Sequence, residues 1–378
     1  MMFRGLLAVA TAAALSVFQG ANAAPLEAYG HLPTLEDVVI SPQGDRLAYV
    51  TSVEGKRTVL VQSIAPKKLL AALFVGGTKL RSLAWIDQDH IVVTTSTTAF
   101  ASQVIAARAE WSIGLVLDVA HHRTTRLLDN VKLTVPIMNI VGGRPEPRVV
   151  DGRPTVFVTG FQFFSEGRGT PVLFAVDANT GDTKLVEENS PHASGWLLDA
   201  NGAAIAEEDY SENTKHWSLK LKRGGGWAEV YGMDTQIDHP WIAGLSGDGQ
   251  SVLVGGTDKN NDQLRPLSLS TAKFGDQMES GRPVQSLVTD PRTQRVRGAR
   301  VVTTQTEYDF FDPKDQADWD NVAAAFPGED VSLVSMSDDR TKLVVLVQGQ
   351  QHGVVYELMD LAANAILPRP TVLAPEPT

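Results

Sequence analysis

Cysteine is missing from this chain of 378 residues. Its absence excludes disulfides, cysteine nucleophiles and metal sites that use thiolate ligands. The folded chain must therefore be stabilised by packing and hydrogen bonding without covalent cross-links.

Basic residues are scarce. There are 33 Lys and Arg residues against 44 Asp and Glu residues, which gives a formal net charge of −11. Proteins that bind nucleic acids present a basic surface to the phosphates, so we expect no nucleic-acid partner. The content of 43% hydrophobic and 20% charged residues is ordinary for a soluble globular protein.

The start of the chain has no apolar run long enough to span a bilayer. Arg4 precedes an apolar stretch from Leu6 to Phe18, which suits the central part of a signal peptide. The small residues of Ala21-Asn22-Ala23 then fit a signal-peptidase site. We predict a signal peptide over residues 1–23, no membrane anchor, and a periplasmic or secreted bacterial protein, with cleavage between Ala23 and Ala24.

A short phrase recurs along the rest of the chain. It consists of a polar turn with Ser, Asp or Gly, followed by a run of branched apolar residues. Close copies begin at Ser41, Ser246 and Ser337, and looser copies begin at Trp85, Asp151, Asp199 and Asp290. Most neighbouring copies are about 44 to 48 residues apart, which is the period of four-stranded propeller blades.

This repeat predicts an all-β fold, a β-propeller with seven blades of four antiparallel strands, over residues 28–366. A single unit would leave one face of its strands exposed, whereas stacked units bury it. The third copy lies far from the second, so six or eight blades stay open as alternatives.

Local patterns predict hairpins within the units and two departures from them. Strands are expected at residues 46–50 and 58–64, and at 173–177 and 183–187, with Gly-containing turns between them. An Ala-rich segment from Ala99 to Trp111 has possible helical character. A short helix is predicted after Asp312 as N-cap, with Pro313 at its first position. Both departures are expected to decorate loops at the rim of the propeller.

The motifs of common catalytic and metal sites do not occur. No Gly-x-Ser-x-Gly nucleophile elbow is present, and Gly224-Gly225-Gly226 lacks the Lys-Ser/Thr of a phosphate-binding loop. His121 and His122 are adjacent, so on a strand they would point to opposite faces. We expect no metal ion and no cofactor.

One acidic cluster, Glu207 and Glu208, is a candidate binding site. Glu207 and Glu208 could together bind the free amino terminus of a peptide, because an ammonium group suits clustered carboxylates. The surrounding residues instead favour a strand that runs into a turn, where neighbouring side chains point to opposite faces. Both could reach one ligand only across a bulge.

Three segments resemble the amino-terminal propeller of exported bacterial members of the prolyl oligopeptidase family of serine peptidases. The acylaminoacyl-peptidase and dipeptidyl-peptidase branches are the most similar. The resemblance is carried by Leu35–Tyr49, by Leu83–Val92, and by Tyr308–Pro313 together with Ala325–Gly328.

The resemblance implies that a Ser-Asp-His triad lies in an α/β-hydrolase domain after the propeller, and that the propeller restricts access to short peptides. Here the propeller is followed by a Pro-rich segment at residues 367–378, interpreted as a linker to an absent catalytic domain. No catalytic residue is therefore assigned, and whether this chain is itself an enzyme stays open. The expected partners are an α/β-hydrolase domain and, with it, short peptides.

A second hypothesis is a free-standing periplasmic propeller that acts as a binding or scaffold module. Propellers commonly present one rim to a partner, and their fold alone does not decide function.

Overall fold

The computed structural model describes residues 35–53, 55–99, 108–131, 137–163, 169–188, 190–257, 264–278 and 284–367. The predicted signal peptide and the Ala23–Ala24 cleavage site lie outside these residues, as does the chain after residue 367. Leu367, which was predicted to begin the linker, instead ends strand β26 (Ala365–Leu367).

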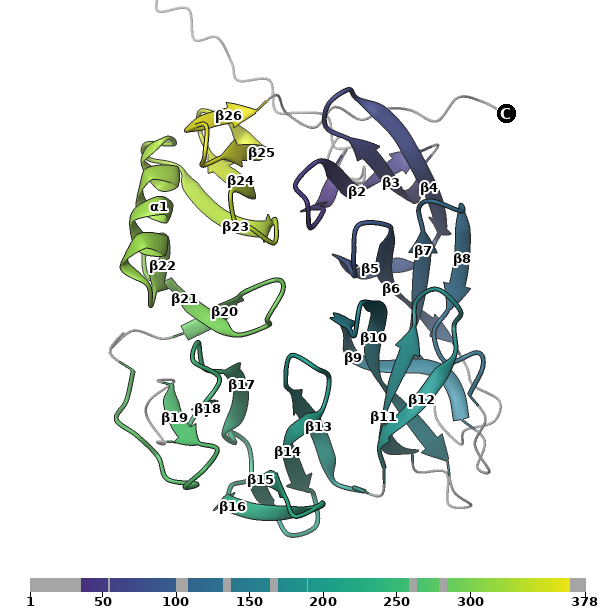
Figure 1. Cartoon of the computed structure of the whole chain (residues 1–378), viewed down its shortest axis with the longest axis vertical. Helices are drawn as coiled ribbons and strands as arrows, with labels where there is room; N and C mark the ends of the chain where they lie inside the picture. The colour runs from purple at the N-terminus through teal and green to yellow at the C-terminus, as the bar shows by residue number, and fades with distance from the viewer. Residues whose placement is uncertain are drawn as a thin grey trace, which may run out of the picture. The chain divides into compact units, whose positions relative to one another are not determined.

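The described residues form seven antiparallel sheets, each built from consecutive strands, that follow one another around a ring (Figure 1). Blade 1 contains β1 (Glu36–Ile40), β2 (Arg46–Val53), β3 (Lys56–Ser63) and β4 (Lys68–Gly76). Blade 2 contains β5 (Lys79–Trp85), β6 (His90–Ala99), β7 (Ala109–Asp118) and β8 (Arg123–Arg126). Blade 3 contains β9 (Ile137–Val150), β10 (Arg153–Phe163), β11 (Gly169–Asp177) and β12 (Thr183–Glu187).

The remaining blades follow in the same order. Blade 4 contains β13 (Ala193–Leu198), β14 (Ala204–Ser211), β15 (His216–Arg223) and β16 (Gly226–Asp234). Blade 5 contains β17 (Trp241–Leu245), β18 (Ser251–Gly255) and β19 (Arg265–Ser268), and blade 6 contains β20 (Val284–Thr289), β21 (Val296–Val302) and β22 (Thr306–Phe310). Blade 7 contains β23 (Asp330–Met336), β24 (Lys342–Gly349), β25 (Gly353–Asp360) and β26. The predicted all-β propeller with seven blades is confirmed.

Each copy of the repeated phrase is the turn between the first and second strands of one blade. In blade 5, the amide of Ser251 donates a hydrogen bond to Ser246 Oγ at 3.0 Å, and the amide of Gly249 donates to the Ser246 carbonyl at 2.8 Å. The turns at Ser41 and Ser337 repeat both hydrogen bonds. The phrase recurs because one serine closes the turn at both its hydroxyl and its carbonyl group.

Buried apolar side chains fill the spaces between neighbouring blades. Tyr49 and Leu60 of blade 1, for example, pack in one cluster with Val344 and Leu358 of blade 7. Comparable clusters join blades 1 and 2, 2 and 3, 3 and 4, 4 and 5, and 6 and 7. The packing between blades therefore supplies most of the core, as expected for a repeat array.

Blades 5 and 6 are joined differently. Within the residues that the structure describes, no buried apolar cluster spans these two blades. A parallel bridge links Leu245 to Arg295, and Arg295 Nη1 donates a hydrogen bond to the Gly247 carbonyl at 3.3 Å. Val296 of blade 6 also lies against Gly244 of blade 5, so this interface combines polar contacts with a smaller apolar contact.

The ring closes between blades 1 and 7 without a sheet that combines strands from both ends of the described chain. The amide of Ile40 donates to Ser335 Oγ at 2.9 Å, and the amide of Asp338 donates to the Pro42 carbonyl at 2.9 Å. Apart from such single hydrogen bonds, the closure rests on the cluster of Tyr49 and Leu60 with Val344. The described residues of blades 1 and 7 thus share no strand ladder.

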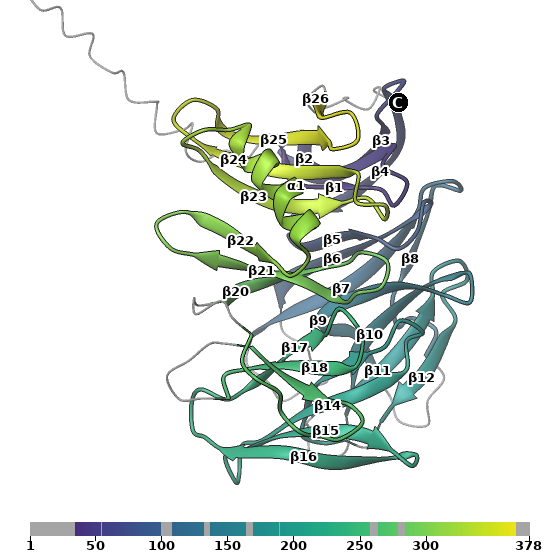
Figure 2. The same ribbon diagram turned by 60° about the vertical axis from the view of Figure 1, so that its left-hand side comes forward.

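Helix α1 (Pro313–Ala324) confirms the predicted helix and its cap. Asp312 is the N-cap, and its side chain accepts a hydrogen bond from the Lys314 amide at 2.7 Å. The helix lies beside β22 and β23 (Figures 1 and 2) and buries Trp319 and Val322. Among the described residues, no helix has the length and apolar character needed to cross a membrane.

Helix α1 accounts for one of two differences from the predicted four strands per blade. The described residues of blades 5 and 6 form sheets of three strands. In blade 6, α1 follows the third strand and covers the apolar surface that a fourth strand would cover. In blade 5, Leu267 of the third strand forms an isolated antiparallel bridge with Phe274.

The expectation of helical character from Ala99 to Trp111 is wrong at both ends of that segment. Ala99 ends strand β6, and Trp111 lies in strand β7, where it pairs with Thr97. Residues 100–107 are not among the described residues. At Ala99 and Ala109, which pair with each other, pairing between the strands outweighs the helix propensity of alanine.

Candidate functional site

Glu207 is completely buried on strand β14, at the interface of blades 3 and 4. Its Oε2 atom accepts hydrogen bonds from Ser190 Oγ at 2.7 Å and from Trp196 Nε1 at 2.8 Å. Its Oε1 atom lies 3.1 Å from Lys220 Nζ. Three donors therefore satisfy the carboxylate, as the burial of a charge requires.

Lys220 links Glu207 to a second buried carboxylate, that of Asp209, with which it forms an ion pair. Burial raises the pKa of Asp209, and the neighbouring Glu207 raises it further. Burial opposes the charge on Lys220, but its hydrogen bonds and charge interactions with Asp209 and Glu207 are stronger and raise the pKa of Lys220. The three side chains form one internal charged cluster.

Glu208 points to the opposite face of the same strand, toward blade 5. Its Oε2 atom accepts a hydrogen bond from the Ile242 amide at 3.0 Å, and its Oε1 atom accepts one from Ser194 Oγ at 3.2 Å. The structure therefore does not bring Glu207 and Glu208 together. Their joint role in binding a peptide amino terminus stays a prediction, and each carboxylate already has partners within the protein.

The partners of Glu207 lie far from it in sequence. Ser190 and Trp196 precede it by 17 and 11 residues, and Lys220 follows it by 13 residues. One sequence signal could have indicated the cluster, namely the period-two placement of Glu207 and Asp209, which puts both carboxylates on the same face of strand β14. A charged pair on one face of such a strand needs a cation nearby.

The histidines lie in separate contacts. His121 Nδ1 lies 2.9 Å from Asp118 Oδ2, and His239 stacks on Tyr210 with a ring-centroid distance of 5.1 Å. His216 Nδ1 lies 2.6 Å from Asp234 Oδ1 on the surface of blade 4. No group of three or more His, Asp or Glu side chains among the described residues could hold a metal ion.

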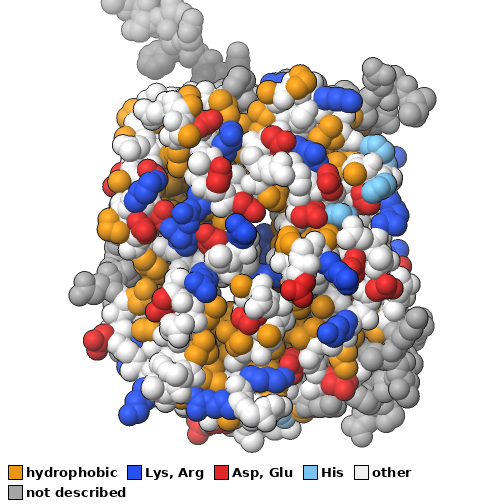
Figure 3. Space-filling model, viewed as in Figure 1, with side chains coloured by type: hydrophobic (Ala, Val, Ile, Leu, Met, Phe, Trp, Pro, Cys, Tyr) orange, Lys and Arg blue, Asp and Glu red, His pale blue; other side chains and the backbone are white. Residues whose placement is uncertain are grey.

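Charges of both signs are interspersed on one face of the molecule (Figure 3). On the face shown in Figure 3, Lys and Arg side chains lie between Asp and Glu side chains rather than in one basic area. Such a face lacks the continuous positive potential that phosphate backbones require.

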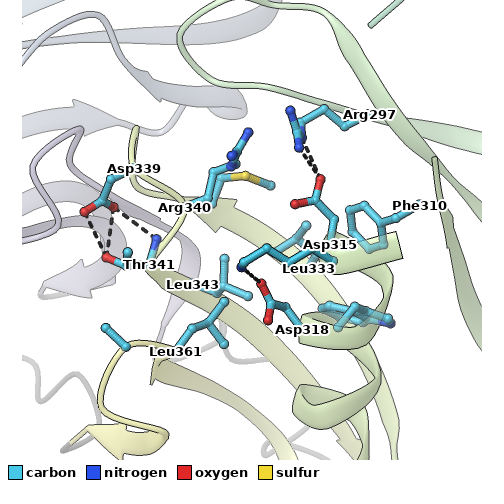
Figure 4. A pocket seen from close by; sticks show the side chains of 14 residues that line it. Arg297, Phe310, Asp315, Asp318, Leu333, Asp339, Arg340, Thr341, Leu343 and Leu361 are labelled. Atoms are coloured by element: carbon cyan, nitrogen blue, oxygen red, sulfur yellow. Dashed lines mark hydrogen bonds and ion pairs between the residues drawn. The ribbon is translucent and has the colours of Figure 1, made fainter. Parts of the chain in front are cut away.

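One cavity lies between blades 6 and 7, next to helix α1 (Figure 4). It has a volume of about 230 Å³. Apolar side chains, including Phe310, Trp319 and Leu343, form part of its wall, and charged side chains including Arg297 and Arg340 also line it. An apolar hollow with a few polar groups is the usual form of a small-molecule site.

Comparison with known proteins supports the family resemblance. No protein-family model matches the chain. An alignment 199 residues long, which covers 51% of this chain, is 23% identical to dipeptidyl aminopeptidase BIII of Pseudoxanthomonas mexicana. The propeller domain of the Trilobed protease from Pyrococcus furiosus, described as having an open Velcro topology, has a similar fold. Its TM-score is 0.51 at 12% identity, over 86% of this chain and 94% of that domain.

The chain is thus similar in sequence, over part of its length, to a dipeptidyl aminopeptidase, and similar in fold to the propeller domain of a protease. The acylaminoacyl peptidase of Pyrococcus horikoshii is a further structural neighbour, with a TM-score of 0.49 at 11% identity over 87% of this chain and 51% of that one. The stretch matched in the dipeptidyl aminopeptidase spans only 28% of that relative's length. The name of that relative therefore describes a protein of which the matched stretch is only a minor part.

Proposed function

We propose that the chain is the propeller portion of a serine peptidase of the prolyl oligopeptidase type. In this role the propeller stands before the active site of an α/β-hydrolase domain and admits short peptides. The observation that carries the proposal is the match of 199 residues to a dipeptidyl aminopeptidase. The closure of blades 1 and 7 without a shared sheet supports a ring that can open.

The proposed setting is the periplasm, or the outside of the cell, after cleavage between Ala23 and Ala24. The motivation is the signal-peptide pattern of residues 1–23. Amino-terminal sequencing of the protein from a periplasmic fraction should show Ala24 as the first residue. A first residue of Met1 in an otherwise cytoplasmic preparation would contradict export.

The proposed function is tested on material isolated from the cells that encode the chain. An affinity tag between Ala24 and Leu35 allows native purification, and a fluorophosphonate probe then labels active-site serines. The expected result is a labelled serine hydrolase, either on the tagged polypeptide or bound to it. Dipeptide p-nitroanilides should be hydrolysed at least about tenfold faster than the same residues at the end of a 20-residue peptide.

If the purified material contains no probe-labelled protein and does not hydrolyse the p-nitroanilides, the peptidase role is wrong. Stoichiometric capture of a single partner that is not a hydrolase would instead favour a free-standing binding module.

The opening of the ring has its own test, because the chain has no native cysteine. A Cβ atom placed on Gly44 would lie 3.4 Å from Ser337 Cβ, near the separation found in disulfides. The double variant G44C/S337C should therefore lock blade 1 to blade 7 when oxidised. We expect the lock to lower peptide turnover and a reductant to restore it, whereas each single variant should be unaffected by the reductant.

Equal turnover in the oxidised and reduced double variant would show that peptides do not enter between blades 1 and 7. That result would leave the filter role standing and would exclude only this route of entry.

A further inference from the structure

The cavity between blades 6 and 7 has a wall that suits an apolar ring. Trp319 of α1 and Leu343 of β24 belong to one buried cluster and both line the cavity, together with Phe310 and Leu333. Figure 4 shows Leu343, Leu333 and Phe310 around it. The volume of about 230 Å³ exceeds the roughly 150 Å³ that is sufficient for an apolar cavity to bind benzene. An aromatic side chain with a short polar extension therefore fits.

Arg340 lines the cavity in a backbone conformation that an arginine rarely adopts. Its φ angle is +60°, and the same turn position holds Gly44 in blade 1 and Gly249 in blade 5, both with φ of +73°. A side chain in the left-handed region costs about 1 kcal/mol or more, whereas glycine adopts it freely.

The guanidinium group of Arg340 has unused donors that a ligand could reach. Nη1 donates to Asp290 Oδ2 at 3.2 Å in an ion pair, and this is the one hydrogen bond of the guanidinium group within the part of the chain described by the structure. The side chain is 39% exposed. The remaining N–H groups form a planar fork that matches a carboxylate.

The acidic side chains around the cavity are already paired. Asp315 accepts from Arg297 Nε at 2.8 Å, and Asp318 accepts from Lys314 Nζ at 2.5 Å. Asp339 accepts from the hydroxyl and amide groups of its own turn. Three basic and three acidic side chains line the cavity, and Arg340 is itself ion-paired with Asp290. The N–H groups of Arg340 that this pair leaves unused are the donors that the anionic group of a ligand could contact.

We propose that this cavity binds a small amphipathic carboxylate, with its aromatic or branched apolar group between Trp319 and Leu343 and its carboxylate on Arg340. The class includes the carboxyl-terminal residue of a short peptide. The proposal rests on the cavity alone and does not depend on the peptidase role.

The test uses N-acetyl-L-phenylalanine and its uncharged amide as a matched pair of probes, titrated into the full chain by isothermal calorimetry. For a ligand of this size we expect a dissociation constant of about 1 mM for the acid. The amide should bind at least about tenfold more weakly, because it cannot form the charge-assisted pair.

Two variants and a control separate ligand binding from folding. R340G removes the guanidinium and suits the φ of +60°, and it should weaken binding of the acid at least about tenfold. A362W should also abolish binding, because Ala362 lines the cavity and the indole would fill it. Q294G is the control, since Gln294 has a φ of +58° in the equivalent turn of blade 6 and does not line the cavity.

The proposal is overturned if acid and amide bind equally, if R340G binds as the unmodified chain does, or if R340G and Q294G lose binding together. It is also overturned if the acid shows no binding up to about 20 mM.

Discussion

Glu207 shows how a residue that looks like a ligand-binding group in sequence can be occupied within the fold. It is fully buried, and Ser190, Trp196 and Lys220 donate to its two oxygens. Removal of one member of a buried charged pair is costly because it leaves the other member uncompensated. The carboxylate of Glu207 therefore stabilises the packing of β13, β14 and β15 in blade 4.

The substitution E207A should lower the free energy of unfolding by about 2 to 4 kcal/mol, since it leaves three donors without their acceptor. The matched control E208A removes a partly exposed carboxylate with one backbone partner, and should cost about 1 kcal/mol. Urea denaturation followed by tryptophan fluorescence measures both. Equal, small effects would mean that Glu207 is not the anchor described here.

His90 and two aspartates make blade 2 sensitive to pH. His90 Nδ1 lies 2.9 Å from Asp87 Oδ1, and its Nε2 lies 3.9 Å from Asp118 Oδ2. Burial acts to lower the pKa of His90, but the hydrogen bond to Asp87 and the charges of the nearby aspartates outweigh it and raise this pKa above 6.5. Burial likewise acts against the charged forms of Asp87 and Asp118, but their hydrogen bonds are stronger and lower the pKa of each below 3.8.

The direction of the pH effect follows from these shifts. A raised histidine pKa stabilises the fold fully below about pH 6.5, and this stabilisation is lost as the pH rises through the pKa of the folded state. The lowered aspartate pKa values stabilise the fold above about pH 4, and that contribution is lost on acidification. Both contributions coexist between these limits.

We therefore expect the free energy of unfolding to fall between pH 6 and pH 8.5, and the variant H90N to reduce this fall. Urea denaturation at the two pH values is the measurement, with the exposed His122 replaced by Asn as the control. An unchanged pH dependence in H90N would show that another group is responsible.

At the scale of elements, helix α1 is the part of the chain that departs from the strand repeat. Its start was predictable, because Asp312 followed by Pro313 is a capping sequence whose chemistry is local. Its position was not predictable, since burial of Trp319 and Val322 depends on the surfaces of blades 6 and 7. The helix thus takes the place that a fourth strand occupies in most other blades.

The substitution D312A should destabilise the protein by about 1 kcal/mol, because the Lys314 amide loses its acceptor. The control D312S keeps a capping oxygen and should cost no more than a few tenths of a kcal/mol. Chemical denaturation gives the totals, and hydrogen exchange of the first turn of α1 shows whether the loss is local. A larger loss for D312S than for D312A would contradict the capping role.

At the scale of the whole molecule, the seven interfaces between blades are not equivalent. Six contain buried apolar clusters in the described residues, whereas blades 5 and 6 are joined by the Leu245–Arg295 bridge and a single arginine contact. Apolar burial stabilises by about 25 cal/mol per Å², so an interface with little of it separates at lower cost. Among the described residues, the interface with the least clustered apolar burial is therefore the one between blades 5 and 6, whereas the closure of blades 7 and 1 contains an apolar cluster.

Amide hydrogen exchange should reveal this difference. We expect the strands β17 and β20, which flank the interface of blades 5 and 6, to exchange at least about tenfold faster than β1 and β23, which flank the closure. Oxidation of the G44C/S337C variant serves as the control, because it should slow exchange at the closure and leave β17 and β20 unchanged. Faster exchange in β1 and β23 would place the weak point at the closure instead.

The sequence by itself determined the propeller repeat, the turn at each copy of the phrase and the start of α1, whereas the structure decided for seven blades over six or eight. These features follow from local chemistry that repeats, such as the Ser246 turn with its two hydrogen bonds. The tertiary structure alone decided what surrounds each charged side chain. Glu207 gains Lys220 from a neighbouring strand, and Arg340 meets Trp319 and Leu343 at a cavity between two blades. Contacts between strands depend on register, and contacts between blades depend on how the repeats stack. The spacing of residues along one strand predicts neither of these.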